Sequence, residues 1–256
     1  MEGHNVVFEL RVGEFKRERL AEAAAELVRM KVDVIVTSTD EAIAVVKQQT
    51  QSIPIVMANS ADPVGTGFVA SLARPGGNIT GNSSMSPELA GKRLELLKEI
   101  VRGLTRVAIV WNPDLRGAVL DYKETESAAR ALQLQLQSVE VTRVGEFDRA
   151  FVAMTASRAE AVFVTGPNPV AFTSRSEIVK LAQKNRLPAI YPSGDFVDAG
   201  GLMAYGLNPV ELWRRAADQV RAGDQSEGGE GPRTHDHAAA PAQGGSRRRV
   251  RCVRRC

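Results

Sequence analysis

Polar side chains gather where apolar, strand-like runs of this chain end. Thr37-Ser-Thr-Asp40 and Ala58-Asn-Ser-Ala-Asp62 each follow such a run directly. Hydroxyl and amide groups of this kind can bind a carboxylate, and an acid such as Asp62 can hold an amine. Helix capping would equally explain the first segment, and a simple turn before Pro63 would explain Asp62.

Three similar segments occur in the second half of the chain: Asn112-Pro-Asp114, Thr165-Gly-Pro-Asn168 and Tyr191-Pro-Ser-Gly-Asp195. Taken singly, each is also compatible with an ordinary turn. Parallel strands end at one edge of their sheet, and ligands bind beyond that edge. Together the segments therefore predict a two-sided polar cleft. The candidate ligand-binding residues are Thr37, Ser38, Thr39, Asn59, Ser60, Asp62, Asn112, Thr165, Gly166, Tyr191, Ser193, Asp195 and Tyr205.

Residue combinations typical of catalysis are scarce. His4 is the only histidine before the C-terminal tail, and both cysteines, Cys252 and Cys256, lie in that tail. The sequence contains no nucleophile elbow, phosphate-binding loop or zinc-protease motif. We therefore predict no catalytic residues, no metal site, no cofactor and no enzymatic activity. A small α/β enzyme that uses Asp62 or Asp195 as a general base is the alternative.

Charge and hydropathy limit the classes of partner. The net charge is +3 over 256 residues. Residues 223–256 hold seven arginines and four acids, so the rest of the chain is neutral and predicts no nucleic-acid binding. No run approaches the roughly 18 apolar residues of a membrane span. The N-terminus has neither the basic region nor the apolar core of a signal peptide.

The elements that must position the cleft alternate along residues 5–220. The pattern predicts strands at 6–10, 32–36, 53–57, 107–111, 134–141, 161–165, 189–191 and 201–205. It predicts helices at 15–30, 40–49, 88–101, 115–132, 145–156, 174–185 and 209–221. Strands separated by helices indicate parallel sheets in an α/β fold. We expect two doubly wound lobes with a ligand cleft between them. The first lobe spans 1–85 and is completed by 201–222; the second spans 86–200.

The segment Asp62–Gly81 is long and rich in glycine and proline. Long ordered loops in compact domains are usually functional. We expect a short helical piece at 68–73, a position at the lip of the cleft, and the passage from the first lobe to the second.

The last 34 residues, 223–256, are rich in glycine and arginine and have no apolar face. Such a composition cannot offset the entropy of ordering, so it predicts a disordered tail. It is either an arginine-rich interaction arm or a non-native tail, for example from a shifted reading frame.

Several segments resemble the family of ABC-transporter substrate-binding proteins that includes the tryptophan-binding type, with the type I periplasmic-binding-protein fold. The similar segments cover about residues 4–221: Leu20-Ala-Glu-Ala-Ala-Ala-Glu-Leu-Val28, Val32-Asp-Val-Ile-Val36, Ile53-Pro-Ile-Val56, Asp62-Pro-Val-Gly65, Val69-Ala-Ser-Leu-Ala-Arg-Pro-Gly-Gly-Asn-Ile-Thr-Gly81, Lys92-Arg-Leu-Glu-Leu-Leu97, Pro188-Ala-Ile-Tyr191, Phe196-Val-Asp-Ala-Gly-Gly-Leu-Met203 and Tyr205-Gly206.

The resemblance implies the solute-binding component of an ABC import system. It implies an amino-acid-like or small aromatic or polar ligand between the lobes, permease subunits as partners, a monomer and a periplasmic location. A sensor or repressor core would share the fold, but no helix-turn-helix segment precedes residue 5.

The chain departs from the family pattern at both ends. The resemblance implies a signal segment, a strand and a helix before Gly3, and a strand–helix ending beyond Arg221, none of which the sequence shows. We therefore expect a truncated chain with an incomplete first lobe and reduced stability. Without a signal peptide, such a chain would remain in the cytoplasm.

Overall fold

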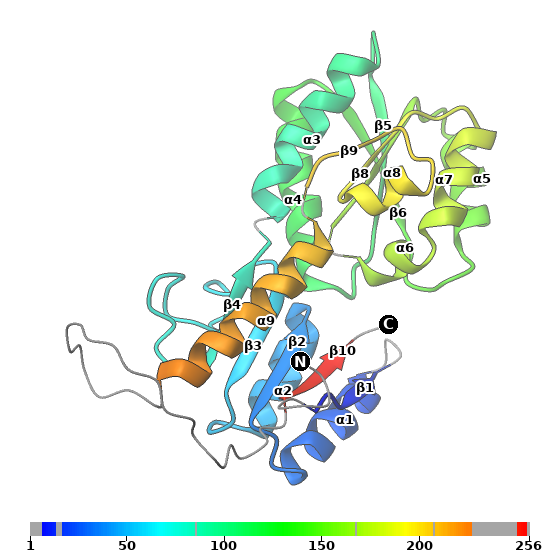
Figure 1. Ribbon diagram of the computed structural model, residues 1–256. Helices are drawn as coiled ribbons and strands as arrows, with labels where there is room; N and C mark the ends of the chain where they lie inside the picture. Colours follow the sequence, from blue (N-terminus) through cyan, green and yellow to red (C-terminus); the bar gives the residue numbers. More distant parts are fainter. Residues whose placement is uncertain are drawn as a thin grey trace, which may run out of the picture.

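The computed structural model describes residues 7–13, 17–84, 86–166, 168–206, 208–226 and 250–254. These residues form two lobes, each built on a five-stranded parallel sheet (Figure 1). The strand order is β1-β10-β2-β3-β4 in the first lobe and β6-β5-β7-β8-β9 in the second. The predicted α/β class with parallel sheets is confirmed. None of the helices described is both long and apolar enough to cross a membrane.

The first lobe consists of β1 (Leu10–Val12), α1 (Arg17–Arg29), β2 (Val34–Ser38), α2 (Asp40–Gln49), β3 (Ile55–Ser60), β4 (Ile79–Ser83), α9 (Pro209–Ser226) and β10 (Val250–Arg254). Helices α1 and α2 bury Leu27 and Ile43 against Ile35 and Ile55 of the sheet. The buried residues of α1 recur every three or four positions, which is the spacing of one helix face. This packing closes one side of the first sheet.

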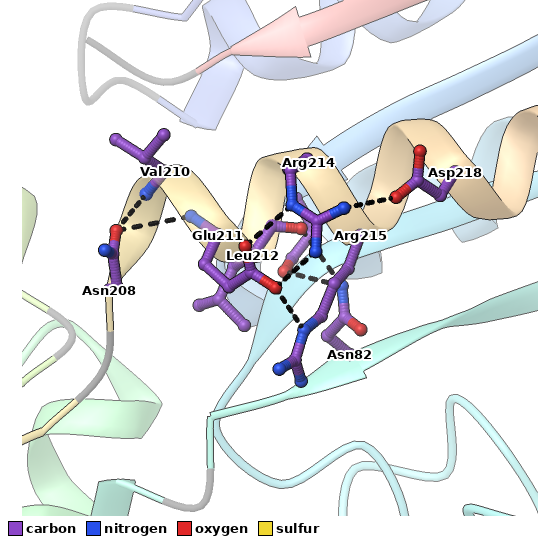
Figure 2. A network of polar contacts seen from close by, with 9 residues as sticks. Asn82, Asn208, Val210, Glu211, Leu212, Arg214, Arg215 and Asp218 are labelled. Carbon is purple, nitrogen blue, oxygen red and sulfur yellow. Dashed lines mark hydrogen bonds and ion pairs between the residues drawn. The ribbon is translucent and has the colours of Figure 1, made fainter.

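Helix α9 covers the other side of that sheet, where Ala216 and Trp213 pack against Val36 and Val56. Figure 2 shows how the helix is attached. The Asn208 side chain accepts hydrogen bonds from the amides of Val210 and Glu211 at 3.0 and 3.2 Å.

From β4, the Asn82 amide donates to the carbonyl of Leu212 at 3.2 Å. Ion pairs of Glu211 with Arg214 and Arg215 lie on the exposed surface of α9, where such pairs contribute little stability. Burial and the Asn82 contact therefore hold this helix in place.

The second lobe consists of α3 (Ser86–Ile100), β5 (Arg106–Trp111), α4 (Arg116–Ala131), β6 (Gln135–Glu140), α5 (Phe147–Ala156), β7 (Ala161–Val164), α6 (Pro169–Thr173), α7 (Arg175–Lys184), β8 (Ala189–Tyr191), α8 (Gly194–Asp198) and β9 (Met203–Ala204). On one face of the sheet, Leu94 and Leu97 of α3 pack with Ile109. On the other face, Phe151 of α5 and Ile178 of α7 belong to a separate buried cluster. The sheet is thus covered on both faces.

The chain crosses between the lobes after β4 and again after β9. The second crossing differs from expectation, because β9 pairs with β8 and so belongs to the second lobe. The predicted return to the first lobe at residue 201 is therefore wrong, and the return lies between β9 and α9. A strand of two residues carries too little pattern to assign it to a sheet from sequence.

The segment Asp62–Gly81 contains no helix at 68–73 and does not pass between the lobes. Val69 and Ile79 are buried in this stretch and Phe68 packs against the same cluster, but Leu72 is 62% exposed, so 68–73 has no continuous buried face. Its last residues enter β4, which pairs with β3 in the first lobe. Gly81 has φ of +143°, and a Cβ atom there would lie 2.2 Å from the carbonyl oxygen of Met57. Glycine is therefore required for this close strand pairing.

The C-terminal segment also departs from the expectation of a wholly disordered tail. Residues 223–226 complete α9, and Val250–Arg254 forms β10, which lies between β1 and β2 and is parallel to both. Its backbone groups gain partners on two sides, which supplies the ordering that composition alone did not predict. The rest of the predicted tail, 227–249 and 255–256, lies outside the described residues.

Candidate functional site

A cavity of about 910 Å³ lies between the two lobes. Both sheets contribute residues from their strand ends, and the rest come from the two crossings, from helices α3, α6, α7, α8 and α9, and from the segment that enters β1. The lining residues are Phe8, Glu9, Leu10, Ser38, Thr39, Asn59, Ser84, Ser86, Leu89, Arg93, Gly166, Asn168, Pro169, Phe172, Thr173, Arg175, Pro192, Ser193, Asp195, Phe196, Gly206, Pro209, Val210, Leu212 and Trp213. The predicted cleft at the carboxyl ends of the strands is thus a real cavity.

Ser38, Thr39 and Asn59 form the part of the cavity that we call the first-lobe wall. Thr39 precedes α2, and its Oγ1 accepts a hydrogen bond from the amide of Ala42 at 3.4 Å. Its own amide donates to the carbonyl of Asn59 at 3.0 Å. The side-chain oxygen of Asn59 is buried and has no hydrogen-bond partner within the described parts of the chain.

Asp40 supports the first-lobe wall through hydrogen bonds of its carboxyl group. Its Oδ1 accepts hydrogen bonds from the Ser60 hydroxyl at 2.5 Å and from the Ala61 amide at 3.1 Å. Burial raises the pKa of this carboxyl, and the bond from Ser60 opposes that shift. Its second oxygen is buried and has no partner among the residues described. One carboxyl oxygen therefore connects the ends of β2 and β3.

The second-lobe wall comprises Arg93, Gly166, Asn168, Ser193 and Asp195. Asn168 precedes α6, and its Oδ1 accepts the amide of Ala171 at 3.1 Å. The remaining Asn168 nitrogen and the Ser193 hydroxyl are buried, and neither has a partner in the described structure. Two polar side chains thus line the cavity with unused hydrogen-bonding capacity.

A buried ion pair lies beneath this wall. Nη2 of Arg93 lies 2.7 and 2.9 Å from the two carboxylate oxygens of Asp121, and the side chains are 1% and 0% exposed. Arg93 also donates to the carbonyl of Ser86 at 3.1 Å and lies over the ring of Phe163 at 4.9 Å. Ser86 begins α3 directly after the crossing, so the pair connects the crossing to the cavity.

Asp121 also positions the wall itself, because its Oδ2 accepts the amide of Gly166 at 2.7 Å. Burial raises the pKa of Asp121 to about 6, and the neighbouring Arg93 guanidinium opposes the shift. A Cβ atom at Gly166 would lie 2.9 Å from the Ser86 hydroxyl and 3.1 Å from Pro192. Glycine therefore allows the wall to approach the crossing closely.

Large apolar side chains fill the space between the polar groups. Leu89, Phe172, Phe196 and Trp213 line the cavity, and they come from both lobes. The guanidinium of Arg175 lies 4.9 Å from the ring of Phe172, and its Nη1 donates to the Phe172 carbonyl at 3.0 Å. A mostly apolar cavity with a few fixed polar groups is the usual form of a small-molecule site.

Of the thirteen predicted site residues, the structure brings six to the cavity: Ser38, Thr39, Asn59, Gly166, Ser193 and Asp195. Five others are buried beside or behind it: Thr37, Ser60, Asn112, Thr165 and Tyr191. The Thr165 hydroxyl donates to the carbonyl of Val110 at 3.1 Å, and Asn112 accepts the amide of Asp114 at 2.9 Å. These residues support the strand ends and do not line the cavity.

The remaining two, Asp62 and Tyr205, lie outside the cavity lining. Asp62 accepts the amide of Gly65 at 2.7 Å, which is the turn role considered as its alternative. The Asp62–Gly81 segment instead contacts the second lobe beside the cavity, where Arg116 donates to the Gly65 carbonyl at 3.2 Å. The segment therefore does not line the cavity, and its predicted position at the lip of the cleft is wrong, although the segment does contact both lobes.

Sequence reasoning missed Arg93, Asp121 and the cavity residue Arg175. A usable signal existed for the first two. Arg93 falls on the helix face that carries Leu94 and Leu97, and Asp121 shares the buried face of α4. Charged residues at core positions of two neighbouring helices predict a buried ion pair. Within the described residues, no group of three or more acidic, histidine or cysteine side chains could hold a metal ion.

Comparison with known proteins gives consistent matches. The model of the family described as ABC transporter substrate binding protein matches residues 1–223. A curated tyrosine-binding protein from Clostridioides difficile (strain R20291) is 22% identical over 217 residues, which cover 85% of this chain and 62% of that protein. This chain therefore spans less than two thirds of that relative.

Two solved structures share the fold. A protein from Vibrio cholerae O1 biovar eltor superposes with a TM-score of 0.79 at 23% identity. The match covers 88% of this chain and 74% of the Vibrio chain. An ABC domain in complex with L-Trp from Streptococcus pneumonia has a TM-score of 0.74 at 21% identity. The match covers 82% of this chain and 70% of that domain's chain. With the family model matching most of its length, the chain belongs to the ABC transporter substrate binding protein family.

Proposed function

We propose that this protein is the solute-binding component of an ABC import system and that it binds a small molecule in the cavity between its lobes. The observation that carries this proposal is the interlobe cavity of about 910 Å³ with unpaired, buried polar atoms on both walls. Its volume lies in the range of about 300–1,000 Å³ that small-molecule sites occupy. A ligand that spans the cavity can satisfy both walls at once.

The lining favours an amino-acid-like or small aromatic or polar ligand. Phe172 and Trp213 offer aromatic surface, while Asn59, Asn168 and Ser193 offer hydrogen bonds. The names of the relatives agree with this class, since one is called tyrosine-binding and one structure holds L-Trp. We propose Ser38, Thr39, Asn59, Gly166, Ser193 and Asp195 as ligand contacts, with Asn168 and Arg93 added.

Ligand binding would act through closure of the lobes. A ligand that contacts both walls only in the closed form shifts the population toward that form. The closed form is then the one that permease subunits recognise. Members of this family typically work in the periplasm or outside the cell. We propose the same location for the whole protein, and a monomeric state.

The alternative of an enzyme has less support from the site. Asp62 does not line the cavity and already accepts the Gly65 amide. Asp195 does line the cavity, and it is the only one of the two candidate bases, Asp62 and Asp195, that does so. The other carboxylate of the lining, Glu9, is paired with Arg11 at 3.3 Å. These two carboxylates do not by themselves define a reaction, whereas unpaired donors and acceptors on two walls define a binding site.

Isothermal titration calorimetry with L-tyrosine, L-tryptophan, benzoate and 4-hydroxybenzoate tests the proposal. We expect one or more to bind with a stoichiometry near one and to be recovered unchanged by chromatography. Asn59→Ala, on the first-lobe wall, should weaken binding about tenfold. The matched control Ser127→Ala, on the exposed face of α4, should leave affinity unchanged. Chemical conversion of the ligand would favour the enzyme, and absence of binding to all four would contradict the proposed ligand class.

A further inference from the structure

We propose that the second-lobe wall is a subsite for hydrogen-bond acceptors and that it receives a carboxylate group of the ligand. This inference rests on the proposed function and adds the direction in which the ligand lies. It begins from three buried atoms, on residues that line the cavity, which have no partner in the described structure: Nε of Arg93, Nδ2 of Asn168 and Oγ of Ser193. Their residues are 1%, 6% and 6% exposed.

The chemistry of the two nitrogen atoms fixes them as donors, and the hydroxyl can donate as well as accept. An arginine Nε can only donate. The Asn168 amide cannot be reversed without loss, because its oxygen accepts the Ala171 amide at 3.1 Å and its nitrogen must therefore face away as a donor. The Ser193 hydroxyl precedes α8 but makes no capping bond, so it is free to donate as well. Three donors without acceptors favour a ligand group that is rich in lone pairs.

A carboxylate meets that requirement better than a single carbonyl, because its two oxygens offer about four acceptor positions. The guanidinium of Arg175 adds positive charge to the cavity lining, while the charge of Arg93 is balanced by Asp121. Asp195 contributes one negative charge to the lining, while the charge of Glu9 is balanced by Arg11 at 3.3 Å. A ligand head that carries both a carboxylate and an ammonium group would satisfy the donors and Asp195 together.

The first-lobe wall has the opposite character. Its unpaired buried atom is Oδ1 of Asn59, which is an acceptor and requires a donor from the ligand. The three hydroxyl residues 37–39 were the expected carboxylate site. Thr37 is fully buried and does not line the cavity, and the Thr39 hydroxyl accepts the Ala42 amide. Ser38 and Thr39 keep hydroxyl protons that can be donated, but the buried groups that still lack an acceptor gather on the second lobe. We therefore place the carboxylate of the ligand at the second lobe and a donor group, such as a phenol or an indole N–H, near Asn59.

The test compares matched ligands that differ in the carboxyl group: L-tyrosine with tyramine, and L-tryptophan with tryptamine. Affinities are measured by calorimetry at pH 7.5 for the full chain and for Ser193→Ala, Asn168→Asp and the surface control Ser127→Ala. Asn168→Asp keeps the oxygen that accepts the Ala171 amide, so it preserves the helix start. It replaces the donor with an anionic oxygen. Thermal unfolding of each variant without ligand confirms that it folds.

We expect Ser193→Ala to weaken binding of the amino acids about tenfold and binding of the amines less than twofold. Asn168→Asp should weaken the amino acids about a hundredfold, because a carboxylate would then face a carboxylate, and should leave the amines unchanged or bound more tightly.

Equal losses for acid and amine in both variants would overturn the subsite while leaving the proposed function intact. The same conclusion would follow if the wild-type protein bound the amines as tightly as the amino acids. A wild-type protein that bound none of the four ligands would overturn this inference together with the proposed amino-acid class.

Discussion

The two walls of the interlobe cavity are held in different ways. Behind the second-lobe wall lies an ion pair between Arg93 and Asp121 that is almost completely buried and also bonds Gly166 and Ser86. Behind the first-lobe wall, one oxygen of Asp40 joins the ends of β2 and β3. Because removing one member of a buried ion pair costs more than losing single hydrogen bonds, we expect disruption behind the second-lobe wall to cost more stability than disruption behind the first.

Breaking the ion pair should produce the largest effect. Asp121→Ala leaves the Arg93 guanidinium buried without its carboxylate, so we expect the free energy of unfolding to fall by about 3–5 kcal/mol. Urea denaturation measures this loss. The double variant Arg93→Met with Asp121→Leu removes both charges and should recover much of the stability. A loss below about 1 kcal/mol in the single variant would show that the second-lobe wall is not held by this pair.

The same pair should make stability depend on pH. Burial raises the pKa of Asp121 to about 6, above its ordinary value of about 4. The carboxyl therefore contributes stability that is fully present below about pH 4 and is lost as the pH rises through about 6.

Between pH 4 and pH 7 the wild-type protein should lose roughly 3 kcal/mol relative to the double variant, since one pKa unit corresponds to about 1.4 kcal/mol. Urea denaturation of both proteins at several pH values in that window gives the difference. Parallel pH profiles would mean that Asp121 stays ionised throughout and that its pKa is not raised.

A smaller loss is expected on the first-lobe wall. Asp40→Ala leaves the Ser60 hydroxyl and the Ala61 amide without their acceptor, which should cost about 1–3 kcal/mol. Asp40→Asn retains the accepting oxygen and should cost less than about 1 kcal/mol. If Asp40→Ala destabilised the protein as much as Asp121→Ala, the supports of the two walls would contribute equally to stability and the contrast between them would fail.

The smallest effect is expected where the lobes touch beside the cavity. Arg116→Ala removes the exposed hydrogen bond to the Gly65 carbonyl, so stability should change by less than about 1 kcal/mol and ligand affinity by less than about threefold. Arg130→Ala is a matched control, because that arginine pairs with Glu126 of its own helix. A tenfold change in affinity for Arg116→Ala alone would identify this contact as a determinant of lobe closure.

Much of the fold was predictable because buried parallel strands carry long apolar runs, as in Val107-Ala-Ile-Val-Trp111. Strand β4 was not, since Ile79-Thr-Gly-Asn-Ser83 is polar and pairs with β3 alone at the edge of its sheet. The short helices α6 and α8 are five residues long and give no measurable period.

Only the part of the candidate site that lies at the ends of strands was predictable from the sequence. Periodicity identifies the end of a strand but not which of two adjacent residues faces the cavity, so Ser38 and Thr37 were not separated. Arg93 and Asp121 each stand out as a charged residue at a core position of its helix, but they are 28 residues apart on different helices. That these two side chains meet follows from packing between elements and not from local pattern.

A crystal structure of the protein grown with L-tyrosine would show whether both walls bind one ligand. We expect one ligand between the lobes, with its carboxylate bonded to Asn168 and Ser193 and its phenol directed toward Asn59. A ligand bound against one wall alone would rule out a site that both walls share. So would one seated in the smaller cavity of about 250 Å³ beside Val179, Leu187 and Tyr191.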